Sequence, residues 1–341
     1  MTTETTTQAA GAGPESIQVK AAEFRAKFGE LREEIGKVIV GQKDIVDDIL
    51  TCIFAGGNCL LEGVPGLGKT LLVRTLSEVF DLEFRRIQFT PDLMPADITG
   101  TQVLHATEGG GHVLRFEPGP LHAHCVLADE INRATPRTQS ALLEAMQEHT
   151  VTVGRETRAL PQPFMVLATQ NPVEQEGTYP LPEAQLDRFL FKLLVPYPRE
   201  EDYHLILSRT TGSEEVAVEH VADAAQVRAL QATVRRVAVP ESARKMAIHL
   251  VMATQPGSSL APEVVNRCVA LGSSPRGAQA LILGGKVRAL LDGRAALSTA
   301  DVRATAADAL RHRVMLNFRG HAEHQTGDRI VTEVLEAVRA D

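Results

Sequence analysis

The spacing of apolar and polar residues changes once along this chain, and the change divides the chain into two parts. Up to about residue 196, short apolar runs that end in polar residues alternate with stretches of helical spacing. That pattern is typical of a parallel sheet covered by helices. Beyond Pro196-Tyr197-Pro198 the spacing is helical throughout. We therefore predict an α/β domain over 17–198 and an all-α domain over 199–320.

The elements of both parts can be placed on the sequence. Strands of the sheet are predicted at 58–62, 84–89, 124–129, 164–170 and 191–195, and β-hairpin inserts at 101–104 with 112–116 and at 151–153 with 157–160. The prolines of 90–95 should break any helix there. Helices are predicted at about 17–35, 43–54, 135–148, 200–211, 222–237, 240–254, 276–291 and 299–312.

The two ends of the chain differ from the domains. Residues 1–16 are rich in Thr, Ala and Gly without an apolar period, which predicts a disordered tail. Residues 321–341 form a C-terminal tail with helical spacing over about 326–339, and the sequence leaves open whether that helix is docked or loose.

A phosphate-binding loop lies between the first strand and the helix after it. Residues 63–70 read G-x-x-x-x-G-K-T. Its glycines let the backbone turn N–H groups toward phosphate oxygens, and the helix N-terminus adds further donors. We expect Lys69 to contact the β- and γ-phosphates and Thr70 to offer its hydroxyl to Mg²⁺. The predicted nucleotide contacts are Gly63, Val64, Pro65, Gly66, Leu67, Gly68, Lys69, Thr70 and Leu71.

A short apolar turn at 38–42 precedes this loop. Val40 and Gly41 are candidates to pack against an adenine ring, and a plain connecting turn is an equally good interpretation of the pattern.

Polar residues end two of the buried strands. Asp129 and Glu130 follow the apolar run 125–128, and Asn171 follows the run 164–168. Ligands of open α/β sheets bind at the carboxyl ends of the strands. Together with the phosphate loop, this predicts Asp129 in the Mg²⁺ shell and Glu130 orienting the attacking water. If the two strands are neighbours, Asn171 can hydrogen-bond that water or the γ-phosphate.

Composition narrows the classes of partner. The net charge of −8 gives no global basic field, and 4% aromatic residues without Trp offer no basic–aromatic cluster for stacking bases, so nucleic acid is a disfavoured ligand. The four cysteines match no zinc template, and the histidines lack matched ligands for a metal. No apolar run approaches the roughly 18 residues of a membrane span, and no signal sequence is evident. We therefore expect no membrane insertion and a cytoplasmic location.

Over about residues 20–320 the chain resembles the MoxR family of AAA+ ATPases. The most specific stretches are FTPDLMPADITG at 89–100, LADEINRA at 127–134 and ATQNPVEQEGTYPLPEAQLDRF at 168–189. The resemblance implies Walker A at 63–70, Walker B at Asp129 and Glu130, and sensor 1 at Asn171. Its further implied arginines are Arg188 as the finger that reaches the neighbouring subunit's nucleotide, Arg276 as sensor 2, and Arg133 and Arg137 as other intersubunit candidates.

The same resemblance implies a function. A MoxR-type protein would be a Mg²⁺-dependent ATP hydrolase in an oligomeric ring, with a hexamer expected, and a chaperone that remodels, assembles or activates a partner. In the family that partner is commonly a protein with a von Willebrand factor A domain. Three alternatives remain open from the sequence: an AAA+ nucleic-acid motor, a metal-chelatase motor subunit, and a regulatory module that senses ATP and barely hydrolyses it.

Overall fold

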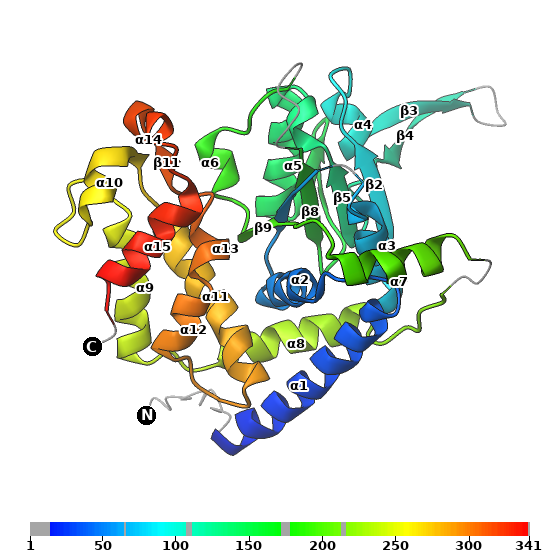
Figure 1. Cartoon of the computed structure of the whole chain (residues 1–341). Helices are drawn as coiled ribbons and strands as arrows, with labels where there is room; N and C mark the ends of the chain where they lie inside the picture. Colours follow the sequence, from blue (N-terminus) through cyan, green and yellow to red (C-terminus); the bar gives the residue numbers. More distant parts are fainter. Residues whose placement is uncertain (1–13, 65, 107–110, 172–177, 213–215, 340–341) are drawn as a thin grey trace, which may run out of the picture.

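The short apolar runs of the first part of the chain form one parallel sheet. The computed structural model describes residues 14–64, 66–106, 111–171, 178–212 and 216–339. The strands are β1 (Cys59–Glu62), β2 (Phe84–Gln88), β5 (Cys125–Asp129), β8 (Met165–Gln170) and β9 (Phe191–Leu194), in the order β2-β5-β8-β1-β9, and all neighbours are parallel. The predicted strands are confirmed (Figure 1).

Alternate residues of these strands face two separate cores, because side chains of a strand point to opposite faces. Leu61, Leu127 and Leu167 join one core with the helices α1 (Pro14–Gly36), α2 (Lys43–Ala55) and α3 (Lys69–Val79). Val126 and Val166 join the other core, with α4 (Pro95–Thr99) and α5 (Pro136–Glu148). Helices therefore cover both faces of the sheet, as the fold class predicts.

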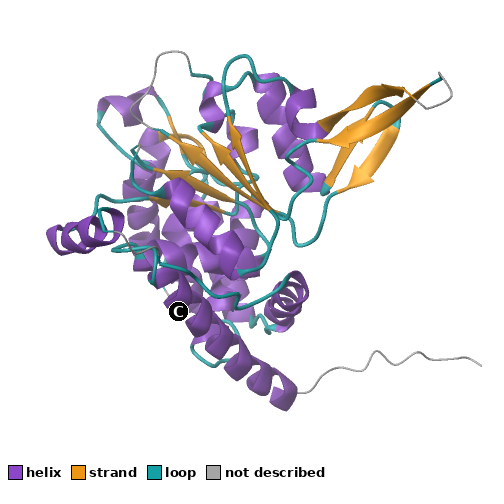
Figure 2. Ribbon diagram, turned by 90° about the vertical axis from the view of Figure 1, so that its right-hand side faces the viewer, coloured by secondary structure: helices purple, strands orange, loops and turns teal. Residues whose placement is uncertain are grey.

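Both predicted hairpins are confirmed. They are β3 (Gly100–Ala106) with β4 (His112–Pro118), and β6 (Thr150–Val153) with β7 (Glu156–Ala159). Figure 2 shows them projecting together from one side of the sheet. They also touch, because the Arg158 guanidinium lies 4.1 Å from the centre of the Phe116 ring.

The prolines of 90–95 break any helix before residue 95, as predicted, because residues 90–94 are not helical. The helix α4 begins at Pro95, its first residue. Proline is tolerated there because the N–H it lacks has no partner within the helix, and its fixed φ suits a helix start.

The second part of the chain is a helical lid packed against the first. Its elements are α7 (Glu200–Thr210), α8 (Ala224–Arg236), α9 (Glu241–Ala253), α10 (Glu263–Cys268), α11 (Pro275–Leu291), α12 (Thr299–Ala304), α13 (Ala306–Leu310), α14 (Phe318–Ala322) and α15 (Gly327–Ala337). The helix predicted over 299–312 is divided at Thr305, and the lid also holds a small antiparallel pair, β10 (Val269–Leu271) with β11 (Met315–Leu316).

The lid and the first core share one continuous apolar cluster. The helix α11 packs against α1 and α2, and α13 packs against the edge strand β9. Ile330, Val331 and Val334 of α15 are buried in the same cluster, so this C-terminal helix is docked. Of the predicted N-terminal tail, residues 1–13 lie outside the described residues, and α1 begins at Pro14.

The contact between α2 and the lid contains a carboxyl with an altered pKa. Asp48 Oδ1 lies 3.4 Å from Arg288 Nη2 of α11. Burial, with the nearby charge of Asp308, raises the pKa of Asp48 from 3.8 to about 7. Between these two pH values the folded chain binds more protons than the unfolded chain, so this group makes the free energy of unfolding fall as pH rises.

We expect Asp48→Asn to remove that pH dependence and to raise the free energy of unfolding above pH 7. Urea unfolding at pH 5 and pH 8 measures both effects. Asp44→Asn is the control, because Asp44 is an exposed acid in the first turn of the same helix. A lower stability of Asp48→Asn at pH 8 would mean that the pairing with Arg288 outweighs the cost of burial.

Candidate functional site

The phosphate loop connects β1 to α3 in the way the sequence predicts. Gly66 and Gly68 have φ angles of 86° and 74°, a region that side chains other than glycine rarely adopt. Within the loop, Lys69 Nζ donates to the Gly63 carbonyl at 2.6 Å. Burial lowers the pKa of Lys69, and the charges of Asp129 and Glu130 act in the opposite direction. The carboxyl groups of Asp129 and Glu130 therefore lie close enough to Lys69 for their charges to affect its pKa.

The turn before α2 is tied to this loop. Gln42 Nε2 donates to the Leu67 carbonyl at 3.0 Å. Beside the turn is a cavity of about 980 Å³, whose lining includes Val40 and Gly41 from the turn and Arg199 and Asp202 from the start of α7. The adenine contact predicted for Val40 and Gly41 stays a prediction, and this cavity is the space next to them.

Asp129 is held at the end of β5 by side chains from both neighbouring strands. Its Oδ1 accepts from Thr169 Oγ1 at 2.5 Å, and its Oδ2 accepts from Arg86 Nη2 at 2.7 Å. The carboxylate is 9% exposed. Burying a carboxylate without such partners is costly, so Arg86 and Thr169 compensate the burial of Asp129 at the carboxyl end of β5.

Glu130 follows in a left-handed conformation, with φ of 57°. Its backbone N–H donates to Thr169 Oγ1 at 2.9 Å. Its carboxylate accepts from Gln88 Nε2 at 2.8 Å and forms an ion pair with Arg133 Nη1 at 3.4 Å. Arg133, a candidate for contact with a neighbouring subunit, therefore pairs with Glu130 of its own chain.

Sequence reasoning missed Arg86, Gln88 and Thr169. A signal for Gln88 existed, since it ends the strand that pairs with β5, and its Cα lies opposite that of Asp129 in the parallel register. Asn171 was found: β8 does neighbour β5, and Asn171 is buried directly after it. The prediction for Asn171 required that its strand neighbour the strand of the acid pair, and the two strands are neighbours.

Arg188 lies in a different place. It follows α6 (Glu183–Leu186) and lines a cavity of about 420 Å³ with Ser140, Glu144, Glu148 and Gln185. The lining contains no residue of the phosphate loop. Arg188 Nε is buried, with no hydrogen-bond partner among the described residues. This placement fits an arginine that acts outside its own nucleotide site.

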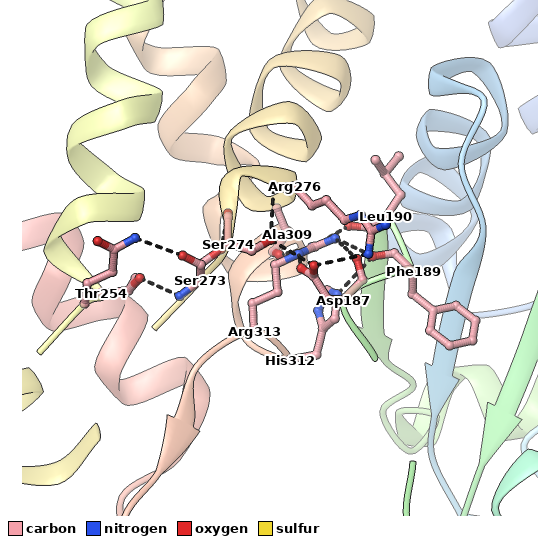
Figure 3. A network of polar contacts seen from close by, with 11 residues as sticks. Asp187, Phe189, Leu190, Thr254, Ser273, Ser274, Arg276, Ala309, His312 and Arg313 are labelled. Carbon is pink, nitrogen blue, oxygen red and sulfur yellow. Dashed lines mark hydrogen bonds and ion pairs between the residues drawn. The ribbon is translucent and has the colours of Figure 1, made fainter. Parts of the chain in front are cut away.

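Arg276 contacts the segment that carries Arg188. It lies at the start of α11, where its Nη1 is 3.5 Å from Asp187 Oδ2 (Figure 3). Its Nη2 donates to Gln147 Oε1 at 3.4 Å. None of its hydrogen bonds or ion pairs found in the described part of the chain reaches the phosphate loop. The sensor 2 role of Arg276 stays a prediction.

Comparison with known proteins supports the interpretation of this geometry. The model of the ATPase family associated with various cellular activities (AAA) matches residues 58–191, and the AAA lid domain model matches 262–334. The chaperone MoxR1 of Mycobacterium tuberculosis is 40% identical over 89% of this chain and 80% of its own length. The protein MoxR of Methylorubrum extorquens is 30% identical over 86% of this chain and 89% of its own. The chain belongs to the MoxR family of AAA+ ATPases.

Other relatives of this MoxR-family chain agree on the fold. An uncharacterized protein of Bacillus subtilis, YeaC, is 43% identical over 92% of this chain and 94% of its own. A crystal structure of a candidate ATPase from Cytophaga hutchinsonii has a TM-score of 0.88 and 40% identity, and the match covers 96% of this chain and 98% of the other. The predicted family and the predicted AAA+ core with its lid are confirmed.

Proposed function

We propose that this MoxR-family ATPase hydrolyses ATP with Mg²⁺ in an oligomeric ring, with a hexamer expected. The proposal rests on one observation: the residues expected to act in hydrolysis lie in two separate places. The phosphate loop and the acid pair lie together, whereas Arg188 lines a cavity elsewhere with its Nε unpaired among the described residues. A second copy that brings its Arg188 to this loop would complete the site.

The donors beside the loop suit a magnesium ion. Thr70 lies in the first turn of α3, and Asp129 offers a buried carboxyl group at the carboxyl end of β5. Among the described residues no three His, Cys, Asp or Glu side chains gather as a metal site. Mg²⁺ commonly uses one or two protein ligands together with substrate phosphates, so Thr70 and Asp129 would hold it. When bound, the ion would neutralise charge on the transferred phosphoryl group.

The chain's own residues then have separate roles. Lys69 compensates phosphate charge, and Asn171 and Glu130 orient the attacking water. Gln88 and Arg133 fix the direction of the Glu130 carboxylate through the contacts described above. Phosphoryl transfer depends on such positioning and charge neutralisation more than on covalent chemistry.

We propose a chaperone role for this activity, in which hydrolysis remodels, assembles or activates a partner with a von Willebrand factor A domain. Its support is kinship, including a mycobacterial relative named as a chaperone. The net charge of −8 argues against a nucleic-acid motor. In the described residues no helix is long and apolar enough to span a membrane. The four cysteines are free and buried, which suits the reducing cytoplasm that we propose as its location.

Capture of the partner tests this role. ATP-loaded Glu130→Gln protein should hold its client, so we expect it to recover a von Willebrand A-type protein from nuclease-treated lysate, identified by mass spectrometry. Lys69→Ala protein, which should not bind ATP, is the matched control. Recovery of replication or repair proteins, or loss of every partner on nuclease treatment, would favour the nucleic-acid motor. Recovery of a chelatase subunit would favour the metal-chelatase motor.

A further inference from the structure

A buried arginine of the lid contacts the segment that carries Arg188. Arg313 follows α13, and its side chain is only 2% exposed. A guanidinium has five N–H donors. Nε donates to Asp187 Oδ1 at 2.9 Å, Nη2 to the carbonyls of Asp187 at 3.0 Å and Phe189 at 2.6 Å, and Nη1 to the carbonyls of Leu190, at 3.1 Å, and Ala309. All five donors of Arg313 thus have acceptors (Figure 3).

Four of these five acceptors belong to residues 187–190. The carbonyls of Asp187 and Phe189 are the backbone acceptors directly before and after Arg188, and one nitrogen of Arg313 binds both. A second lid residue, His312, pairs its Nε2 with the same Phe189 carbonyl at 3.1 Å. The backbone of Arg188 is therefore held from the lid on both sides, while its own side chain remains available.

Asp187 extends the same network to the start of α11. Its Oδ2 accepts from Ser274 Oγ at 2.8 Å and lies 3.5 Å from Arg276 Nη1, whereas its Oδ1 serves Arg313. One carboxylate thus links the start of α11, the segment after α13 and the turn after α6. In Figure 3 Ser274, Arg276 and Arg313 of the lid converge on Asp187 of the core.

Stability alone does not require this arrangement. Burial disfavours the charged form of Arg313 and lowers its pKa, and Asp187 opposes the shift. Buried ion pairs can often be replaced by apolar side chains at little cost in stability. What an apolar residue cannot do is hold the carbonyls of Asp187, Phe189 and Leu190 at once, because only the planar, five-donor guanidinium provides that geometry.

We propose that Arg313 is a positioning residue for Arg188, so that the lid of each subunit sets the arginine finger which that subunit presents to its neighbour. The proposal rests on the proposed action of Arg188 in the neighbouring site. Reactive geometry is sensitive to small displacements, and an error of about 1 Å can cost about 10²-fold in rate. A lid that moves relative to the core would therefore change hydrolysis in the next subunit.

Arg313→Lys tests this role while keeping a positive charge beside Asp187. One ammonium cannot reach all of the carbonyls that Arg313 holds, so we expect kcat to fall by about 10²-fold. Affinity for a fluorescent ADP analogue should stay near that of the unmodified chain, and because the lost hydrogen bonds should lower the thermal unfolding midpoint, kcat is measured well below that midpoint. Arg313→Met should show the same kinetic loss, and if it fails to fold, the lysine variant still decides.

Arg311→Met is the matched control. Arg311 also joins lid to core, since its Nη1 donates to the Lys192 carbonyl at 2.6 Å and its Nε to Asp328 Oδ1 at 2.8 Å, but it contacts none of residues 187–190. If Arg313 only fastens the lid, Arg311→Met should lower kcat as much as Arg313→Lys does. If Arg313 positions Arg188, Arg311→Met should turn over near the unmodified rate.

Mixed rings provide a readout that a merely structural role would not change. Glu130→Gln subunits hydrolyse no ATP but carry an intact Arg188, so adding them to Arg313→Lys subunits should restore hydrolysis. No restoration would overturn the positioning role. If Arg188→Ala lowers turnover but Arg313→Lys does not, this inference fails and the proposed function stands. If Arg188→Ala has no effect either, the proposed action in the neighbouring site fails with it.

Discussion

Glu130→Gln protein is expected to bind ATP as the unmodified chain does and to hydrolyse it about 10²- to 10⁴-fold more slowly, the range typical of general-base catalysis. Glutamine has nearly the size of glutamate and can still face Gln88, whose Nε2 donates to Glu130 Oε2 at 2.8 Å. It cannot accept a proton from the attacking water. Phosphate release with saturating ATP and Mg²⁺ measures turnover, and fluorescent nucleotide titration measures affinity.

Comparison with Lys69→Ala distinguishes a loss of ATP hydrolysis from a loss of nucleotide binding. Lys69 belongs to the phosphate loop itself, so its variant should lose nucleotide affinity as well as turnover. The two variants together should dissociate binding from hydrolysis. Normal turnover of Glu130→Gln would remove Glu130 from its proposed role and leave Asn171, Gln88 and Thr169 as the polar groups to test next.

The parts of this site that the sequence predicted are local. The phosphate loop and the strand ends at Asp129 and Asn171 each lie within a short stretch whose pattern predicts them, and the resemblance to the MoxR family added Arg188 as the proposed finger. The contacts of Arg86 and Gln88 with the acid pair depend instead on β2 lying beside β5. Apolar runs predict that strands exist, but they do not give the order in which strands pair.

The network around Asp187 shows the same limit more strongly. Arg313 and Asp187 are 126 residues apart in the sequence, and their contact exists only because the lid docks on the core. An arginine within the run Arg311-His312-Arg313 looks like part of a solvated surface, because unpaired charges are almost never buried. Only the docked structure shows that Arg313 has five acceptors.

Short elements were missed for a related reason. The helices α10 and α14 and the pair β10–β11 are only a few residues long, and tertiary contacts decide whether such segments form. Near Pro95, attention to proline as a helix breaker hid its suitability as a first helical residue. These misses lie in the connections, so they did not change the predicted class of fold.

Arg188→Ala is expected to produce the largest kinetic loss of all, about 10³- to 10⁵-fold in turnover, the range that arginine fingers contribute in related phosphate-loop enzymes. Nucleotide affinity should change little, because the cavity lined by Arg188 contains no residue of its own phosphate loop. Arg137→Ala is the matched control, because Arg137 is an exposed arginine in the first turn of the adjacent α5.

Complementation decides whether Arg188 acts in the neighbouring subunit. Arg188→Ala subunits keep an intact phosphate loop and acid pair, and Glu130→Gln subunits keep an intact finger, so each alone should be nearly inactive. In a mixed ring, an Arg188→Ala site next to a Glu130→Gln subunit receives the missing guanidinium, and hydrolysis should reappear in proportion to such junctions. If Arg188 acted on its own nucleotide, every site in the mixture would lack one group and no activity would return. The mixing experiment therefore shows whether Arg188 acts on the nucleotide of its own subunit or on that of the neighbouring subunit, which a single variant cannot show.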